Sequence, residues 1–451
     1  MTTTQATHDH ATQSLDELLV EWEGQGIRNV LFELPDMHGT PRTKIIPLNK
    51  VRGFAEKGLN MYGGALALDS RSFVVSGTKY NEEVRYADQV LKPDLSTAAI
   101  IPWLNNTARL ICDTYWADGT PLHAAPRHVL RKVVAELDKL GYQAVVGLEY
   151  EFYLLDPVTM KPIFDGLHIF NTTRNVAAPV TERIVELMPQ IGIDIITANC
   201  EYGPGQYEIN YGPHEALRAG DLGFTFKNGV KMIAHQLGYH ATFMTKPFTD
   251  QSACGAHTHI SLVSKESGEN AFLDVNDQHG LSETAYYFTQ GMLNHANAAM
   301  ALMAPTPNCY HRFVPHHFAP SNISWGLEDR SAMVRAKNSR DHRTHLENRL
   351  PTGLSNSYLA TAAVIAAGVL GLKEAQRPPE AVQDLAESHS EFELLPTTLD
   401  AALDALERDE AFRNLVGDEF VQVFTTIKRS ELARLKAHVT DWERDEYLEM
   451  F

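Results

Sequence analysis

The amino-acid sequence predicts an α+β protein, with a small N-terminal unit followed by a larger unit of strands and helices. Residues 15 to about 110 alternate between short apolar segments and turns, which is typical of a small sheet. From about residue 143 onward, strand-like segments with polar residues at alternate positions are separated by long helical segments. The chain of 451 residues has room for two or three domains, and we expect a disordered tail at 1–14 and domains at 15–112 and 113–451.

The N-terminal domain begins with a predicted helix, "LDELLVEWEGQG", for which Ser14 is a suitable N-cap. Strands are expected at the apolar segments 27–36, 43–48, 72–77 and 98–103. The segment 103–122 then predicts a pair of strands that leads into the second domain.

Several segments of the C-terminal domain have helical patterns. The segment 126–142 places its apolar residues on one helical face, with Pro126 in the first turn. Further helices are expected at 214–238 and 281–304, and the last hundred residues are acidic and helical. The uncharged run 352–372 has an apolar part shorter than the roughly 20 residues of a membrane span, so it predicts a buried helix.

Composition and charge exclude several kinds of partner. The net charge is −18, which argues against a nucleic acid or a membrane surface as partner. Four widely spaced cysteines without a CxxC motif predict a reducing compartment, the cytoplasm, and no disulfide framework. The opening "MTTTQATHDHATQ" has no apolar core and no basic start, so we expect a disordered tail and not a signal peptide.

Acidic residues and histidines recur two residues apart on strands or around one turn. The pairs are Glu149 and Glu151, Glu201 and Glu208, His257 and His259, and Glu347 with Arg349. Residues two apart on a strand share one face, and like charges there are costly unless a cation or a proton relieves them. Mg²⁺ and Mn²⁺ prefer such carboxylate oxygens and tolerate an imidazole. A solvated sheet face is the structural alternative.

Arginines gather between residues 312 and 349 of this acidic chain. They are Arg312, Arg330, Arg335, Arg340, Arg343 and Arg349. Guanidinium groups match the geometry of carboxylates and phosphates, although each could instead pair with a local acid. Together with carboxylate-bound metals they indicate phosphoryl transfer between anionic reactants. The sequence has no Walker and no Rossmann glycine motif, so a nucleotide would be held in another way.

These segments resemble the glutamine synthetase family over nearly the whole chain. "GLEYEF", "CEYGPGQYEI", "GAHTHISL", "CYHRFVP", "SWGLEDRSAMVR" and "LENRLP" appear in the family's order. The resemblance implies a β-grasp domain followed by a catalytic domain with a curved antiparallel sheet backed by helices. It also implies an ATP-dependent ligase, in which L-glutamate is activated as γ-glutamyl phosphate and an amine then displaces phosphate.

Position by position, the resemblance implies at least two Mg²⁺ or Mn²⁺ ions per active site. The matching ligands are Glu151, Glu201 and Glu208 for the first metal, and Glu149, His257 and Glu347 for the second. Arg312 and Arg349 match the residues that hold glutamate, and Arg330 and Arg335 those that face the transferred phosphate. His259 and Ser261 match positions on the nucleotide side. His345 stands where the family has an arginine, so we expect Arg343 or Arg340 to make the nucleotide-phosphate contact instead.

The chain departs from the family at both acids of the ammonium site. Phe318 stands where "RxVPGYEAP" has its glutamate, and Gly63 stands where "MFDGSS" has its aspartate. Ammonium is attracted by carboxylates and must lose a proton, whereas a phenyl wall beside His316 favours an amine with an apolar substituent. We therefore expect a γ-glutamyl amide synthetase for an aniline-like arylamine or a small alkylamine, similar to γ-glutamylanilide and γ-glutamyl-alkylamide synthetases. Glutamine synthetase using ammonia is the alternative.

Three further expectations concern the surroundings of the site. His311 and His316 are expected to flank a strand that carries Arg312, and to line a pocket or pack there in preference to forming a metal cluster with His317.

A non-catalytic relative and a metal-dependent hydrolase are alternative functions, but the retained ligand positions and the arginines disfavour them. The resemblance also suggests a dodecamer whose active sites lie between subunits.

Overall fold

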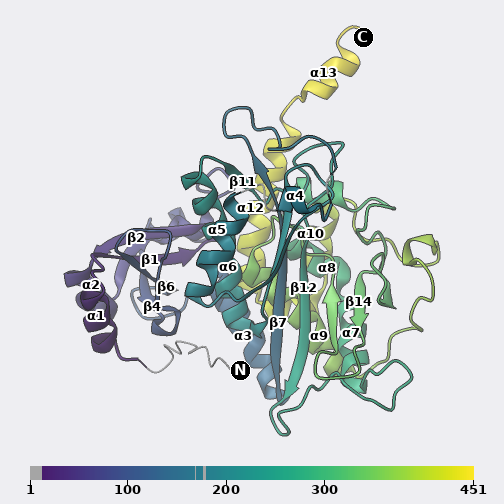
Figure 1. Cartoon of the computed structure of the whole chain (residues 1–451), viewed down its shortest axis with the longest axis horizontal. Helices are drawn as coiled ribbons and strands as arrows, with labels where there is room; N and C mark the ends of the chain where they lie inside the picture. Colours follow the sequence, from purple (N-terminus) through teal and green to yellow (C-terminus); the bar gives the residue numbers. More distant parts are fainter. Residues whose placement is uncertain (1–12, 168, 176–178) are drawn as a thin grey trace.

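The computed structural model describes residues 13–167, 169–175 and 179–451. The N-terminal unit, purple in Figure 1, lies beside a larger body built around two long strands. Apart from its last two residues, the tail predicted at 1–14 lies outside the described residues.

The N-terminal unit is a six-stranded sheet with two helices at one end. Its strands are β1 (Asn29–Pro35), β2 (Pro41–Pro47), β3 (Leu59–Tyr62), β4 (Asp88–Pro93), β5 (Ala99–Ile100) and β6 (Thr107–Tyr115), and its helices are α1 (Leu15–Gly24) and α2 (Leu48–Lys57). The strand order is β2-β1-β6-β4-β3, with β5 also paired to β6. β1 runs antiparallel to β2 and parallel to β6, which gives the mixed sheet of a small α+β unit.

Local sequence explains the start of α1 and the absence of one predicted strand. Ser14 caps α1 as predicted, because its hydroxyl accepts a hydrogen bond from the Glu17 N–H in a capping box. The strand predicted at 72–77 is wrong, since only an isolated bridge from Leu68 to Val74 forms there. The Asp69 carboxylate accepts two backbone N–H groups of the following residues and turns the chain into a loop.

The larger body contains a nine-stranded sheet that is almost entirely antiparallel. Its strands are β7 (Tyr142–Leu155), β8 (Ile195–Cys200), β9 (Gln206–Tyr211), β10 (His214–Glu215), β11 (His240–Thr242), β12 (Ala256–Ser264), β13 (Trp325–Leu327), β14 (Val334–Lys337) and β15 (His345–Asn348). The main order is β13-β14-β15-β12-β7-β9-β8, and β10 and β11 pair with β7. Only the edge pair β13–β14 is parallel among the described strands of this sheet, so the predicted antiparallel sheet is confirmed with one exception.

Helices back one face of this sheet. They are α3 (Pro126–Lys139), α5 (Pro179–Leu187), α6 (Ala216–Gln236), α7 (Glu283–Asn294), α8 (Ala296–Met303) and α9 (Ser357–Glu374). The short helix α4 (Thr172–Asn175) lies beside β8. Tyr150 of β7 stacks on Phe226 of α6, with ring centroids 5.8 Å apart. The single helix predicted at 281–304 is wrong, because the chain leaves helical geometry at His295, whose ring bonds to Asp409.

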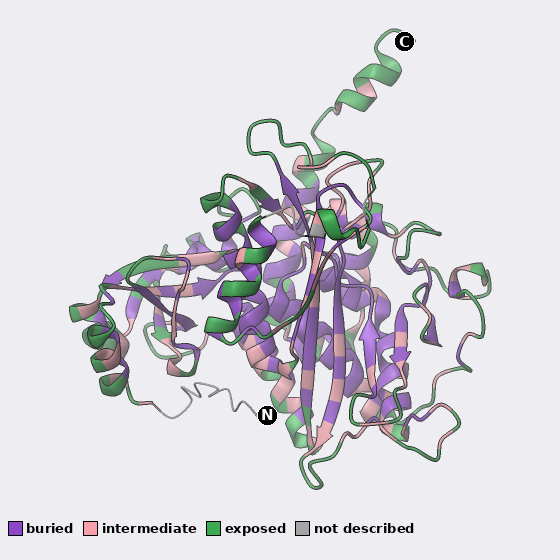
Figure 2. Ribbon diagram, in the orientation of Figure 1, coloured by how far each residue is buried: buried purple, intermediate pink, exposed green. Residues whose placement is uncertain are grey.

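The alanine-rich helix α9 lies at the centre of the body. By length and composition it is the one described helix that could cross a membrane, but 78% of it is buried inside the protein. A Cβ atom on Gly291 of α7 would lie 2.1 Å from the Ala367 oxygen of α9, so glycine is required for this close helix contact. The prediction of a buried helix is confirmed, and Figure 2 shows the buried interior around it in purple.

The C-terminal segment is helical, as predicted. It forms α10 (Leu399–Arg408), α11 (Glu410–Val416), α12 (Asp418–Lys436) and α13 (Asp441–Tyr447). The first three pack on the body, whereas α13 stands away from it and has no buried residue (Figures 1 and 2).

A buried ionic cluster joins the two units. The guanidinium of Arg127, at the start of α3, donates hydrogen bonds of 2.8 Å to Asp94 and 2.8 Å to Asp113 in the N-terminal sheet region. It also donates a bond of 2.9 Å to Asp221 of α6. One buried cation is therefore shared by three carboxylates from three elements, which fixes the N-terminal sheet against the helices behind the larger sheet.

The four cysteines, Cys112, Cys200, Cys254 and Cys309, are buried and form no disulfide bond among the described residues. Burial raises the pKa of Cys112 and of Cys254 well above the usual thiol range. These thiols therefore stay in the protonated, weakly nucleophilic form near neutral pH.

Candidate active site

The register of four neighbouring strands brings the predicted carboxylates and histidines together on one face of the larger sheet. The facing pairs are Glu149 with His257, Glu151 with Glu208, and Glu347 with His259. Side chains of facing residues in an antiparallel sheet lie about 4.5–5.5 Å apart at their Cβ atoms. Tyr150 points to the opposite face and packs on α6, so the predicted alternation along β7 is confirmed.

Glu149 lies at the centre of one half of the site. Its carboxylate is 2.9 Å from His257 Nδ1 and 3.5 Å from His259 Nε2. Burial acts to raise the pKa of Glu149, but the bonds to both histidines outweigh it and hold that pKa well below its usual range. Burial, together with the charge of Arg349, lowers the pKa of His257 to about 4, so its imidazole is neutral at pH 7, the form that binds metals.

The other half of the site holds three glutamates, Glu151, Glu201 and Glu208, and, among the described residues, fewer positively charged side chains than carboxylates. Burial, followed by the charges of the neighbouring glutamates, raises the pKa of Glu208 to about 9. Burial also raises the pKa of Glu151 to about 7 and acts in the same direction on Glu201. The Gln206 amide steadies this half by donating a hydrogen bond of 2.9 Å to Glu151. Neighbouring carboxylates that raise one another's pKa in this way are relieved by a bound cation or by a proton.

The donor chemistry of both halves fits Mg²⁺ or Mn²⁺, because it consists of carboxylate oxygens and a neutral imidazole. The repulsion that raises the pKa of Glu208 is the kind of repulsion that a bound dication removes. As placed, no three His, Cys, Asp or Glu side chains in the described part of the chain meet within coordinating distance of one ion.

Three arginines border the carboxylates. Arg312 is buried and donates a hydrogen bond of 2.9 Å to the main-chain oxygen of Arg349. It lies at the end of a 3-10 helix, Pro307–Arg312, so the prediction of a strand at this place is wrong. Arg349 donates to Glu347, and Arg335 donates a bond of 3.1 Å to the same carboxylate. The Nε–H groups of Arg335 and Arg349 are buried and find no acceptor among the described residues.

The remaining predicted nucleotide and phosphate residues are more scattered. Arg330 is exposed, and its charge acts on Glu201. Ser261 faces Val145 on the same sheet, in the strand that carries both histidines. The exposed guanidinium of Arg343 is paired with Asp341 at 2.7 Å, whereas its main-chain oxygen bonds to His345.

The loop that carries Phe318 lies beside the arginines. The Phe318 side chain is 62% exposed, and its main-chain oxygen accepts a hydrogen bond of 3.0 Å from Arg349. His316 turns away to Glu387, which accepts from its N–H at 2.7 Å and lies 2.9 Å from its Nδ1. His317 bonds to its own loop, and no cluster of the three histidines forms in the described residues.

Two residues of this region were not predicted from the sequence. The Tyr202 ring lies 6.0 Å from the Phe318 ring, and the buried Glu387 carboxylate holds the Phe318 loop. Tyr202 directly follows Glu201, and a search of positions next to predicted ligands would have included it. Glu387 lies in a short 3-10 helix, Ala386–Ser388, far along the chain, where no periodic pattern points to it.

Gly63 belongs to the N-terminal unit. It begins a 3-10 helix, Gly63–Ala67, and its N–H donates a hydrogen bond of 3.1 Å to the Ala87 oxygen. A Cβ atom here would lie 2.7 Å from that oxygen and 3.2 Å from Trp116, so packing alone favours glycine. None of the contacts within residues 13–167, 169–175 and 179–451 joins Gly63 to the carboxylates of the larger sheet.

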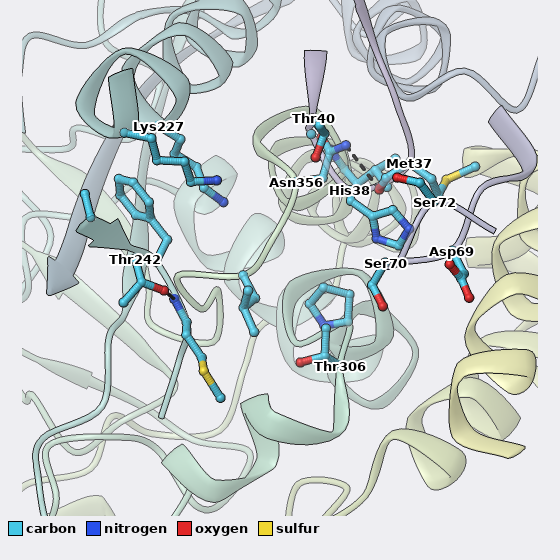
Figure 3. Close-up of a pocket in the computed structure, with 18 of the residues that line it drawn as sticks. Met37, His38, Thr40, Asp69, Ser70, Ser72, Lys227, Thr242, Thr306 and Asn356 are labelled. Carbon is cyan, nitrogen blue, oxygen red and sulfur yellow. Dashed lines mark hydrogen bonds between the residues drawn. The ribbon is translucent and has the colours of Figure 1, made fainter. Parts of the chain in front are cut away.

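A separate cavity of about 620 Å³ lies between the N-terminal unit and helices α6 and α12 (Figure 3). Lys227 of α6 reaches into it from one side, and His38 and Asp69 of the N-terminal unit from the other. The described residues that line it include none of the predicted site residues, so this cavity and the carboxylate site are different places.

Comparison with known proteins gives consistent matches over the whole chain. Residues 123–447 match the family model "Glutamine synthetase, catalytic domain". A protein named glutamine synthetase from Halobacterium salinarum is 34% identical over 467 residues and covers 100% of both chains. Another from Methanocaldococcus jannaschii is 34% identical over 439 residues, which is 94% of this chain and 95% of its own.

Solved structures agree with these sequence matches. A structure described as a GmaS/ADP complex superposes with a TM-score of 0.86 at 31% identity, covering 96% of this chain and 99% of its own. A structure described as a novel glutamine synthase homolog superposes with a TM-score of 0.81 at 26% identity, covering 94% and 99%. Because each superposition covers more than nine tenths of this chain, these solved structures share both the N-terminal unit and the larger body.

Proposed function

This chain belongs to the glutamine synthetase family of ATP-dependent carbon–nitrogen ligases, and we propose that its amine substrate is not ammonia. It joins the γ-carboxylate of L-glutamate to an arylamine or a small alkylamine and releases ADP and phosphate. The observation that carries the proposal is Phe318, an exposed phenyl ring next to Arg349 on the loop where an ammonium site needs an acid.

The basic residues provide the anion-binding part of the reaction. Arg312 and Arg349 are buried cations, and we assign the carboxylates of glutamate to them. Arg335, whose Nε–H lacks an acceptor among the described residues, and the exposed Arg330 face the charge of the phosphoryl group in transfer. His259 and Ser261 are assigned to the nucleotide side.

The acidic residues hold the metal ions. Glu151, Glu201 and Glu208 are proposed for one ion, and Glu149, His257 and Glu347 for the other. Bound Mg²⁺ or Mn²⁺ neutralises phosphate oxygens. In this assignment the cross-strand pairs of the sheet set the spacing of the ligands, and Gln206 orients Glu151.

The choice of amine follows from charge. An alkylamine has a pKa near that of lysine, about 10.4, and must lose a proton before it attacks. An arylamine is neutral near pH 7 because its lone pair is delocalised into the ring, so it needs no acid to attract it and no base to activate it. Phe318 offers such a molecule an apolar contact worth roughly 25 cal/mol per Å² of buried area.

The test is phosphate release from ATP and glutamate with Mg²⁺ or Mn²⁺, comparing ammonia, methylamine, isopropylamine, ethanolamine and aniline. The proposal requires at least a tenfold higher kcat/KM for one of the larger amines than for ammonia, which is about 1.4 kcal/mol. A higher kcat/KM for ammonia would contradict it and would make the protein a glutamine synthetase, as relatives are named.

The surroundings of the reaction are part of the same proposal. We assign 15–112 to a β-grasp domain and 113–451 to the catalytic domain, in a cytoplasmic homo-oligomer. Within one chain, no described contact joins Gly63 to the carboxylates of the larger sheet. A dodecamer in which Gly63 of one copy lines the amine site of another copy would explain this separation. Light scattering of the purified protein measures the assembly.

A further inference from the structure

Two aromatic side chains touch each other in solvent at the edge of the proposed site. Tyr202 is 43% exposed and Phe318 is 62% exposed, and their ring planes are tilted by 41° with centroids 6.0 Å apart. Tyr202 follows Glu201, and the Phe318 main chain is bonded to Arg349. The ring pair therefore lies between a proposed metal ligand and a proposed glutamate-binding arginine, and both rings are accessible from solvent.

The Phe318 loop is held in an unusual conformation. His316 has a φ of 65° and Phe318 a φ of 55°, in the left-handed region that residues other than glycine seldom adopt. Such backbone persists only where the surroundings determine it. Here Glu387, whose side chain is only 8% exposed, accepts from the His316 N–H at 2.7 Å and lies 2.9 Å from its Nδ1. A buried carboxylate thus fixes the loop two residues before the phenyl ring.

We propose that Tyr202 and Phe318 form an aromatic corner that selects planar aromatic amines over saturated amines of the same size, and that Glu387 is the positioning residue of this corner. This inference rests on the proposed function. An aromatic amine can lie offset on one ring and present its edge to the other, at the spacings that aromatic pairs prefer. An aromatic pair stabilises by about 0.5–1.5 kcal/mol beyond the effect of its buried area, so an aromatic amine should gain about 2- to 10-fold in kcat/KM over a saturated amine of the same size.

Aniline and cyclohexylamine make the sharpest comparison, because both have six ring carbons and one amine group. Tyr202→Leu keeps an apolar side chain and removes the ring, and Tyr202→Phe keeps the ring and removes the hydroxyl. Phe54→Leu, on α2 of the N-terminal unit, is the matched control. We expect the kcat/KM ratio of aniline to cyclohexylamine to fall about 2- to 10-fold in Tyr202→Leu and to stay within twofold of wild type in the other two.

Glu387 is tested through the KM for each substrate. Glu387→Ala is expected to raise the KM for aniline and lower the same ratio, with the KM for glutamate unchanged within twofold. Glu387→Gln keeps an oxygen acceptor for the His316 N–H and is expected to restore part of the ratio. Equal rises in the KM for glutamate and for aniline would overturn the positioning role, because they would indicate general damage to the site.

The outcomes separate this inference from the proposed function. If wild type prefers ammonia over every larger amine, the proposed function fails, and this inference fails with it. If wild type prefers the larger amines but the ratio is unchanged in both Tyr202→Leu and Phe318→Leu, only the aromatic corner is refuted. Phe318→Leu also serves as the second variant should Tyr202→Leu fail to fold, which thermal melting reveals.

Discussion

Arg349 Nη2 donates a hydrogen bond of 3.0 Å to the main-chain oxygen of Phe318. The bond uses the backbone of Phe318 and leaves its side chain free to differ. A residue proposed for glutamate binding is thus connected to the Phe318 loop without depending on the chemistry of the phenyl ring. The side chain at 318 can therefore be exchanged while Arg349 keeps its acceptor.

Replacing Phe318 by an acid is expected to shift the amine preference. In Phe318→Glu a carboxylate attracts ammonium and disfavours an apolar ring, so the kcat/KM ratio of ammonia to aniline should rise by at least tenfold, about 1.4 kcal/mol. Phosphate release with each amine measures it, and Phe318→Gln, which has a similar size without the charge, is the control. An equal ratio in the Glu and Gln variants would contradict the role of charge at this position.

Divalent metal is expected to stabilise the fold through the three-glutamate half of the site. Ligand at 100 times its Kd adds about 2.7 kcal/mol to the free energy of unfolding. Mn²⁺ should therefore raise the melting temperature of wild type, and this rise should be smaller in Glu208→Gln, which keeps only the ligands of the second proposed ion. Glu186→Gln, on the surface of α5, serves as control and should keep the full rise. A rise of the same size in Glu208→Gln would remove Glu208 from the ligands.

Removal of Arg127, the cation shared by the two units, is expected to lower the free energy of unfolding strongly. Arg127→Met leaves three carboxylates, on Asp94, Asp113 and Asp221, without their common partner, and breaking a buried pair costs about 3–5 kcal/mol. Arg131→Met removes a 38% exposed arginine that pairs with Asp113 and should cost below about 1 kcal/mol. Denaturant unfolding at fixed protein concentration compares them, and similar losses in both variants would argue against a special role for Arg127.

Stability is expected to depend on pH through Lys227 in the separate cavity. Burial, and then the charge of Lys231, lowers the pKa of Lys227 to about 7, although its Nζ donates hydrogen bonds to two main-chain oxygens. In the unfolded chain this pKa is about 10.4, so the unfolded state binds more protons between pH 7 and 10. The cost of burying the charged amine is complete below pH 7 and is relieved as the pH rises.

The free energy of unfolding of wild type should therefore gain about 1.4 kcal/mol per pH unit from this group between pH 7 and 10. Lys227→Met should lack this gain, so the difference between wild type and variant should grow in favour of wild type with rising pH. Urea unfolding at pH 7, 8 and 9 measures the slope. Parallel slopes in both proteins would mean that Lys227 keeps a normal pKa in the folded state.

Regular strands allowed much of the geometry of the candidate site to be predicted from sequence. The alternation along a strand places Glu149 and Glu151 on one face, and the same alternation relates His257 to His259. The registers that pair these strands depend on the whole sheet, and no single segment encodes them. The predicted strand at Arg312 failed because a proline-led 3-10 helix forms there.

The aromatic contact of the Phe318 loop could not be predicted from local sequence. Tyr202 and Phe318 come from segments far apart in the chain, and their contact depends on a loop with left-handed residues. Left-handed geometry at His316 and Phe318 has no signature in residue type, since glycine occupies neither position. It depends on Glu387, a partner supplied by a third segment.

The four buried cysteines make the protein well suited to chemical labelling. Maleimides react with exposed thiolates, and Cys112, Cys200, Cys254 and Cys309 all lie inside the protein. One cysteine introduced on the surface, for example at an exposed position of α13, would be the single reactive handle without removal of any native thiol. Fluorophores or spin labels attached there would report on the position of α13, and the buried side chains would remain unchanged.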